Sequence, residues 1–231
     1  MDDRIYEFWE PCPECNKAAE VLKKQRSIYQ MIPYDAHFAA INPHVYNVDF
    51  SKKLDLIRRY IDNFNTLREV KNGLYFYSSI KGSGKTLIAS VICNEVFSRY
   101  GINSLFLSET RLLEYLEKGQ DGKYDKNGYD ETPKQKIKKA KLLVIDDLGQ
   151  KKTGRDYLND VLFDILDHRL QKKLPTIFTS NYKIDETGLD HRIIDRIYAL
   201  TVPVEIPAVD VREKQARDEN REMMEALGYE T

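Results

Sequence analysis

The feature that most constrains this chain is a glycine-rich run with the sequence Ser79-Ile80-Lys81-Gly82-Ser83-Gly84-Lys85-Thr86. It follows the apolar stretch 74–77 and precedes a stretch in which apolar residues recur at helical spacing. Glycines let backbone N–H groups curl around phosphate oxygens, and the positive end of a helix dipole adds to the attraction. A run of this kind between a strand and a helix predicts a phosphate-binding P-loop, and therefore an α/β fold.

Residue types within this run predict individual roles. Lys85 is expected to reach the β- and γ-phosphates of ATP, and the Thr86 hydroxyl is expected to ligate Mg²⁺. The other candidates for nucleotide binding are Ser79, Lys81, Gly82, Ser83, Gly84 and Leu87. Ser79 replaces the first glycine of the GxxxxGK[ST] pattern, so we expect a negative φ there and an altered loop geometry rather than lost binding. The competing interpretation, a chance Gly-Lys-Thr turn, is disfavoured by the strand–loop–helix context.

The rest of the chain alternates between short apolar runs and stretches with helical periodicity. The sequence predicts strands at 74–77, 104–107, 142–145 and 176–179, and helices at 51–64, 86–100, 155–170 and around 112–116. Such alternation indicates βαβ units and a mainly parallel sheet that is covered by helices on both faces. Ser51 and Ser108 are plausible helix N-caps, Gly101 should end the helix after the glycine-rich run, and 119–132 should be a polar loop.

A second motif ends the predicted strand 142–145. Asp146 and Asp147 follow four apolar residues, so a buried strand would deliver two carboxylates to the phosphate site. We expect Asp146 to hold Mg²⁺ and Asp147 to polarise the attacking water. An aspartate reaches less far than a glutamate would at the second position, which should slow turnover. An Asp-rich turn is the alternative interpretation of this motif.

Polar residues after the later strands complete the predicted site. Asn181, which follows the strand 176–179, is expected to orient the lytic water and to sense the γ-phosphate. Arg196 and Arg192 would lie on a short helix, from which an arginine can stabilise charge on the nucleotide of a neighbouring subunit. Surface arginines, one of them paired with Asp195, are the alternative. Arg212, after the last strand, is a candidate contact for the γ-phosphate of its own chain.

Charge and hydropathy restrict the other classes of function. The chain of 231 residues has a formal net charge of −1, so any nucleic-acid contact requires a local basic patch. The lysines that could follow a single-stranded backbone are Lys123, Lys126, Lys134, Lys136, Lys138, Lys139 and Lys141. A solvated charged face is the alternative for this cluster. No apolar run has the length that a membrane span needs, so we expect no membrane contact.

Three cysteines in a chain of this length do not make a disulfide framework, and we therefore expect a cytoplasmic protein in a reducing compartment. Cys12 and Cys15 have the spacing of a zinc knuckle but supply only half of the ligands. His37 and His44 could complete such a site, although nothing positions them. The alternatives to a zinc site within one chain are two free thiols or a metal site shared between two chains. Cys93 is expected to be a core residue.

Taken together, the motifs resemble the DnaC/DnaI family of bacterial and phage helicase loaders, which are AAA+ ATPases. The resemblance extends over about residues 33–212. It is carried by Gly73-Leu74-Tyr75-Phe76-Tyr77, Ile145-Asp146-Asp147-Leu148-Gly149, Pro175-Thr176-Ile177-Phe178-Thr179-Ser180-Asn181 and Asp195-Arg196-Ile197. It implies an AAA+ core at 46–209 that binds ATP and single-stranded DNA. It also implies that the helical segment 1–45, in which Cys12 and Cys15 could form a degenerate zinc knuckle, grips a hexameric replicative helicase. Residues 210–231 would be a charged helix or tail.

The resemblance further implies how such a loader works. ATP that bridges Lys85, Thr86 and Asp146 of one subunit to Arg196 of its neighbour would favour a self-associated state that grips DNA. Hydrolysis would then release the helicase on DNA during replication initiation or restart. Turnover is expected to be slow and to be stimulated by DNA or a partner.

Three alternatives remain open from the sequence. An IstB-like transposition helper ATPase shares the core, although the run Ile197-Tyr198-Ala199-Leu200 after the Asp-Arg pair favours a loader. A nucleotide-gated adaptor without turnover is kept open by Ser79 and Asp147. A small-molecule P-loop kinase is disfavoured, because the predicted loop 119–132 contains no arginine for a lid.

Overall fold

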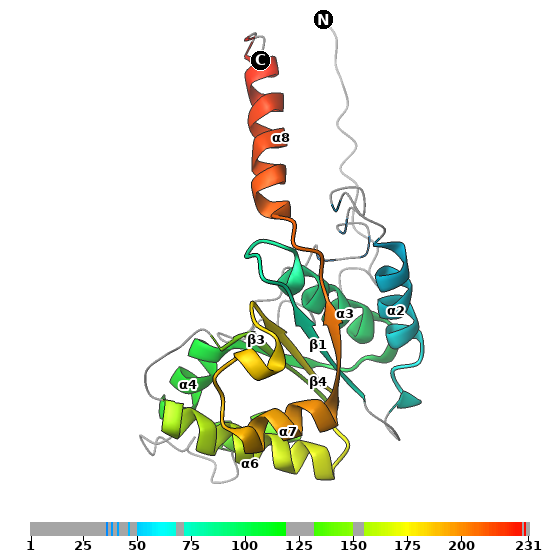
Figure 1. Cartoon of the computed structure of the whole chain (residues 1–231). Helices are drawn as coiled ribbons and strands as arrows, with labels where there is room; N and C mark the ends of the chain where they lie inside the picture. The colour runs from blue at the N-terminus through cyan, green and yellow to red at the C-terminus, as the bar shows by residue number, and fades with distance from the viewer. Residues whose placement is uncertain are drawn as a thin grey trace, which may run out of the picture.

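The computed structural model describes residues 36, 38, 41, 46, 50–67, 72–118, 132–149, 155–227 and 229. Figure 1 shows a central sheet with helices packed around it and one helix that projects from the body. The strands are β1 (Gly73–Tyr77), β2 (Ser104–Ser108), β3 (Leu142–Leu148), β4 (Thr176–Ser180) and β5 (Thr201–Glu205). The helices are α2 (Ser51–Asp62), α3 (Lys85–Tyr100), α4 (Glu109–Lys118), α5 (Pro133–Lys139), α6 (Arg155–Gln171), the 3₁₀ turn η4 (Ile184–Glu186), α7 (His191–Leu200) and α8 (Val211–Ala226).

The five strands form one sheet in the order β2-β3-β4-β1-β5, and every pair of neighbours is parallel. This confirms the predicted parallel α/β fold. The register pairs Leu74 of β1 with Ile177 of β4, and Leu143 of β3 with Thr176 of β4. Because all strands run in the same direction, their carboxyl ends meet at one edge of the sheet, where α/β proteins bind ligands.

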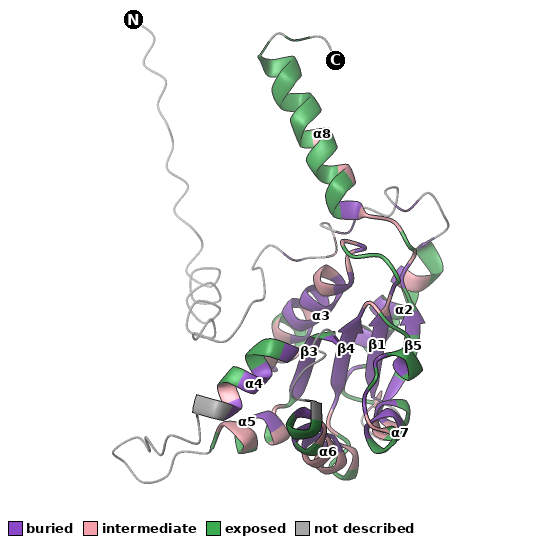
Figure 2. Cartoon of the chain, turned by 60° about the vertical axis from the view of Figure 1, so that its left-hand side comes forward, coloured by how far each residue is buried: buried purple, intermediate pink, exposed green. Residues whose placement is uncertain are grey.

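Successive side chains of a strand point to opposite faces of the sheet, and the two faces carry separate cores. Leu74 and Phe76 pack with α2 and α3 on one face, whereas Tyr75 packs with α4, α6 and α7 on the other. Figure 2 shows the resulting buried central layer between helices whose outer surfaces are exposed. The prediction of a sheet covered on both faces is therefore confirmed.

Helix ends follow the predicted signals in most places. Gly84 precedes α3 and Gly101 ends it in the left-handed conformation with φ of 62°. Ser108 accepts a hydrogen bond from the Arg111 backbone N–H (3.2 Å), as expected of an N-cap. The prediction for Ser51 is wrong, because Ser51 is the first residue of α2 and Phe50 stands at the N-cap position. The Phe50 carbonyl oxygen accepts from the Leu54 N–H at 3.1 Å, so the first intrahelical hydrogen bond starts one residue earlier than predicted.

The elements α5, η4 and β5 were not predicted from the sequence. In α5, Thr132 and Gln135 form a capping box and Ile137 is buried, so a short helix forms where the sequence suggested only a lysine run. The buried Arg169 of α6 holds the end of α5 through hydrogen bonds to three carbonyl oxygens between Ile137 and Ala140. Among the described strands β5 pairs with β1 alone, and an edge strand tolerates Pro203 because its missing N–H is not needed.

The predicted charged helix or tail after residue 210 is the helix α8. The Asp210 carboxylate caps α8 by accepting from the Glu213 backbone N–H at 2.9 Å. Among the residues of α8, all of them described, Val211 alone is buried, and the helix projects away from the core (Figure 1). None of the described helices combines the length and the apolar character that crossing a membrane requires.

Candidate nucleotide site

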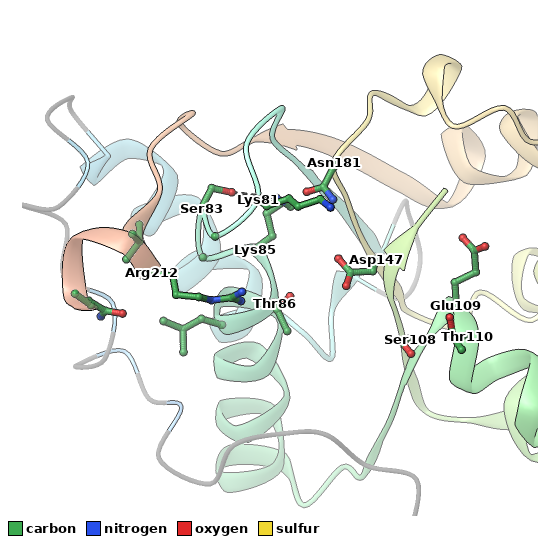
Figure 3. A pocket seen from close by; sticks show the side chains of 15 residues that line it. Lys81, Ser83, Lys85, Thr86, Ser108, Glu109, Thr110, Asp147, Asn181 and Arg212 are labelled. Atoms are coloured by element: carbon green, nitrogen blue, oxygen red, sulfur yellow. Dashed lines mark hydrogen bonds between the residues drawn. The ribbon is translucent and has the colours of Figure 1, made fainter. Parts of the chain in front are cut away.

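A cavity of about 480 Å³ opens at the carboxyl edge of the sheet, between the glycine-rich loop, α4 and the start of α8 (Figure 3). The residues that line it are Lys81, Gly82, Ser83, Gly84, Lys85, Thr86, Leu87, Ser108, Glu109, Thr110, Asp147, Asn181, Val211, Arg212 and Gln215. The structure thus brings most of the predicted nucleotide-binding residues to one cavity.

The glycine-rich loop depends on glycine at two positions. Gly82 and Gly84 have φ of 78° and 87°, a conformation that other residues rarely adopt. A Cβ atom on Gly84 would also lie 2.6 Å from the Tyr46 hydroxyl, and one on Gly82 would lie 2.2 Å from the Asp210 carboxylate. Ser79 does not have a positive φ, as predicted, although it does not line the cavity.

Two distant segments hold the loop in this shape. The Tyr46 hydroxyl donates to the Ser83 carbonyl oxygen at 3.0 Å from one side. From the other side, the backbone N–H groups of Val211 and Arg212 donate to the Gly82 carbonyl oxygen at 3.0 and 3.3 Å. These bonds occupy carbonyl oxygens, so the loop N–H groups are left to face an anion.

Lys85 is nearly buried at the base of the loop. Its Nζ donates to the Ile80 carbonyl oxygen at 3.0 Å and to Ser83 Oγ at 3.1 Å. Burial lowers the pKa of Lys85, while the carboxylates of Asp147 and Asp146 act in the opposite direction. A cation that has lost much of its hydration gains strongly from a polyanionic ligand, which is the task predicted for Lys85.

The two predicted Mg²⁺ ligands are adjacent. Thr86 Oγ1 donates to Asp146 Oδ1 at 3.0 Å, and the buried Thr179 hydroxyl donates to the same oxygen. Burial raises the pKa of Asp146, and the hydrogen bonds from the two threonines partly offset this. A hydroxyl beside a carboxylate is a hard-oxygen donor pair of the kind that holds Mg²⁺ next to a phosphate, so the residues fit that ion.

Asp147 lines the cavity from an unusual backbone conformation. Its φ is 56°, and the pairing of β3 with β4 is irregular between Ile145 and Leu148. The Asp147 N–H donates to Thr179 Oγ1 at 3.0 Å. At this bulge the Asp147 carboxylate lines the cavity (Figure 3). Asp146, by contrast, is buried and contacts Thr86.

Asn181 and Arg212 extend the site from two further elements. Asn181 follows β4 and lines the cavity beside the loop, and Arg212 enters it from the first turn of α8. The structure thus brings both of these predicted residues to the cavity.

The two candidate finger arginines do not line the cavity of their own chain. Arg196 Nη2 lies 3.3 Å from Asp167 Oδ1, and both Arg196 and Arg192 stack on the Phe163 ring, at 4.5 and 5.0 Å. Arg192 also pairs with Asp190 at 3.0 Å. Among the described atoms, the buried Nε of Arg196 has no hydrogen-bond partner. Both arginines therefore lie on the α6–α7 surface, away from the cavity of their own chain.

The lysine cluster before β3 lies on and after α5, at the amino edge of the sheet and so opposite the cavity. Lys134 and Lys138 both pair with Asp164 of α6, the latter at 2.6 Å. Part of the positive charge is therefore neutralised within the chain. Lys123 and Lys126 lie outside the described residues.

Sequence reasoning missed one wall of the cavity. Ser108, Glu109 and Thr110 line it at the junction of β2 and α4, and Val211 and Gln215 line it from α8. A polar Ser-Glu-Thr stretch directly after a predicted strand was the available signal for the first three. The contribution of α8 depends on how the chain returns to the loop, which no local pattern predicts.

The predictions for the zinc knuckle fall outside the described residues, and so do Cys12, Cys15, His37 and His44. Within the described part of the chain, no cluster of three or more His, Cys, Asp or Glu side chains could hold a metal ion. Cys93 is buried in the core as predicted, and burial raises the pKa of its thiol to about 12.

Comparisons with known proteins identify relatives of this chain. The model of the family described as "IstB-like ATP binding protein" matches residues 17–218. The replicative helicase loader DnaI of Bacillus subtilis is 24% identical over 221 residues, which is 87% of this chain and 67% of that protein. The replicative helicase loader DnaC of Escherichia coli K12 is 26% identical over 146 residues, 62% of this chain and 56% of that protein.

The fold is likewise similar to solved structures. A crystal structure of DnaI has a TM-score of 0.59 and 27% identity, over 77% of this chain and 96% of that one. The structural neighbours are AAA+ P-loop proteins, which confirms the expected fold. The alignments span between about half and two thirds of the curated loaders' own length.

Proposed function

Because the chain belongs to the IstB-like ATP-binding protein family, we propose that it is an ATP-dependent loader that delivers a hexameric replicative helicase to single-stranded DNA. The observation that carries the proposal is the assembly of Lys85, Thr86, Asp147 and Asn181 around one cavity of an AAA+ fold. The similarity to DnaI and DnaC supports the loader role in particular.

In this proposal the loop and its flanking residues bind MgATP. Lys85 and the loop N–H groups contact the β- and γ-phosphates, and Thr86 and Asp146 hold the Mg²⁺ ion. When bound, Mg²⁺ neutralises charge that builds up on the transferred phosphoryl group. Arg212 adds a positive charge from α8. The buried position of Lys85 favours tight binding, because little competing hydration has to be removed on contact.

Asp147 and Asn181 are proposed to act on the attacking water. Asp147 polarises the water, and Asn181 orients it while sensing the γ-phosphate. Aspartate is shorter than glutamate, so the carboxylate stands further back and turnover is slow. Slow turnover suits a switch, whose output depends on the different affinities of its two states rather than on rate.

Arg196 is proposed as the finger that completes the site of a neighbouring subunit, with Arg192 beside it. To do so Arg196 has to leave Asp167, from which its Nη2 lies 3.3 Å away. Both partners of this pair are about one-third exposed, so separating them costs about 0–1 kcal/mol. The unpartnered Nε of Arg196 supports the idea that its bonding is completed only in an assembly.

For single-stranded DNA we propose the exposed lysines around α5, together with Lys123 and Lys126. Lys136, Lys139 and Lys141 are exposed, which makes them candidates for phosphate contacts. Residues 1–45 are proposed to grip the helicase, 46–209 to form the ATPase core, and 210–231 to be a C-terminal helix. Zinc binding by Cys12 and Cys15 remains a hypothesis about the first of these segments.

A second candidate is an IstB-like transposition helper ATPase, because the family model that matches carries that description. It uses the same nucleotide site, so the choice depends on the partner. The run 197–200 after Arg196 favours the loader.

The deciding experiment mixes the protein, ATP and the replicative hexameric helicase of its host, and measures the mass by light scattering on a size-exclusion column. Co-elution that is lost when residues 1–45 are deleted supports the loader and its grip. No complex, with DNA-stimulated ATPase activity intact, argues for the transposition helper or for a loader whose helicase is encoded elsewhere, for example by a phage. A nucleotide-gated adaptor is supported instead if ATP binds but no DNA or partner stimulates hydrolysis.

A further inference from the structure

Glu109 is a buried carboxylate in the wall of the cavity that lies opposite the glycine-rich loop. It is the first residue of α4, its side chain is 1% exposed, and it lines the cavity close to Asp147 (Figure 3). Its Oε2 accepts a hydrogen bond of 2.6 Å from the backbone N–H of Gly149. A bond between a charged acceptor and a buried N–H is stronger than one between neutral groups.

The segment that Glu109 holds is the bulge at the end of β3. Asp147 and Gly149 both have left-handed backbones, with φ of 56° and 88°. A residue other than glycine is strained in that region and stays there only where its surroundings fix it. The bulge is also tightly packed, because a Cβ atom on Gly149 would lie 3.3 Å from the Tyr182 ring.

Hydrogen bonds fix the bulge from two sides. From β4, Thr179 Oγ1 accepts from the Asp147 N–H at 3.0 Å, and the Ser180 hydroxyl donates to the Leu148 carbonyl oxygen at 2.7 Å. From the side of β2 and α4, the bond is the one that Glu109 makes to Gly149. The turn that carries the Asp147 carboxylate is therefore hydrogen-bonded on both sides.

We infer that Glu109 is a positioning residue for Asp147: its carboxylate fixes the Asp147–Gly149 turn, so that the Asp147 carboxylate faces the water that attacks the γ-phosphate. Glu109 Oε2 is engaged by the backbone, and Glu109 acts through that backbone rather than on the reacting atoms. This inference deepens the proposed ATPase function and rests on it for its catalytic consequence. Its structural part, the hold on the turn, does not depend on turnover.

Two variants separate the hydrogen bond from the charge. Glu109→Gln keeps a side-chain carbonyl that can accept from Gly149, whereas Glu109→Met keeps the length and loses the acceptor. Glu114→Met is the matched control, since Glu114 lies on the same helix, is exposed and pairs only weakly with Arg111 at 4.0 Å. The full-length variants are compared by backbone hydrogen exchange of the peptide that contains residues 146–149, and by the kcat and KM of ATP hydrolysis.

We expect Glu109→Met to raise exchange at residues 146–149 and to lower kcat by about 10-fold or more, with KM for ATP within about 3-fold of the original. Glu109→Gln should restore both exchange and kcat to within about 3-fold, and Glu114→Met should change neither. Unchanged exchange in Glu109→Met would overturn the inference. Equal loss of kcat in the Gln and Met variants would also overturn it, because the charge and not the bond would then matter.

A general loss of stability would raise hydrogen exchange across the whole sheet, whereas loss of the hold on the turn would raise it at residues 146–149. If Glu109→Met raises exchange throughout the sheet and raises KM together with the fall in kcat, Glu109 is a structural residue only and the inference fails. If the original protein shows no turnover under any condition, the proposed ATPase fails. The exchange comparison of the Met and Gln variants still decides whether Glu109 holds the turn.

Discussion

The two walls of the nucleotide cavity are built in different ways. The loop wall, residues 81–87, is one continuous stretch of chain whose shape follows from glycines with positive φ. The opposite wall, residues 108–110 with the turn 146–149, combines the ends of β2 and β3 and is held by side-chain hydrogen bonds from α4 and β4. We infer that the loop wall mainly decides whether the nucleotide binds, and the opposite wall whether it is hydrolysed.

The largest effect is expected from the loop wall. Lys85→Ala should abolish ATP binding and with it all turnover, because the buried ammonium is the main charged contact predicted for the phosphates. Calorimetric titration with MgATP measures this. Lys81→Ala is the control, since Lys81 also lines the cavity but is exposed, and its loss should weaken binding by less than about 10-fold. Retained affinity in Lys85→Ala would contradict the division between the walls.

Arg196, which lies on neither wall, tests whether binding and hydrolysis can be separated. Arg196→Ala should leave ATP affinity unchanged and lower hydrolysis by on the order of 10³-fold, together with weaker self-association, because Arg196 is predicted to act on a neighbour's nucleotide. Hydrolysis is measured against protein concentration, with Arg192→Ala for comparison. Unchanged ATPase activity in Arg196→Ala would exclude this arginine as the finger.

The opposite wall is tested by Thr179→Val, which keeps the shape of the side chain. The change removes the hydroxyl that donates to Asp146 and accepts from the Asp147 N–H, and leaves that N–H without its buried partner. We expect about 1–3 kcal/mol lower stability and roughly 10-fold lower kcat, with ATP affinity measured without Mg²⁺ unchanged.

Thr201→Val is the matched control for this change. Thr201 is equally buried, and its hydroxyl donates to the Ile197 carbonyl oxygen at 2.7 Å, away from the cavity. It should lower the melting temperature without lowering kcat. If both variants affect kcat alike, the effect of Thr179 is one of general stability.

The smallest effect is a dependence on pH. Burial raises the pKa of Asp146 above 3.8, so the folded protein favours the protonated carboxyl group. The contribution of this group to the free energy of unfolding is therefore lost as pH rises through the raised pKa. Mg²⁺ requires the carboxylate, so MgATP affinity should fall on acidification through the same range, by at most about tenfold per pH unit. Thermal unfolding of the free protein and calorimetry with MgATP should thus show opposite trends. Asp146→Asn should remove both, and trends of the same sign would contradict the assignment.

The sequence predicted the regular part of the molecule well, for identifiable reasons. Strands 74–77 and 142–145 are apolar on both faces, and the helix after the loop is bounded by Gly84 and Gly101, so local patterns were sufficient. The prediction failed where a tertiary contact decides. The N-cap of α2 is Phe50 and not Ser51. The short helix α5 is held by the burial of Ile137 and by hydrogen bonds from Arg169.

The sequence by itself determined the parallel fold, the glycine-rich loop and the two carboxylates after β3, because each is encoded by neighbouring residues whose chemistry and spacing are visible in one stretch of chain. The tertiary structure alone decided that Glu109 supports the turn of Asp147, and that Tyr46 and the start of α8 hold the loop from two sides. These contacts join residues 37 to more than 100 positions apart, or cross from one strand to the next. The strand order and burial decide which residues meet in these contacts, because a buried polar group has to find its hydrogen-bond partner within the fold.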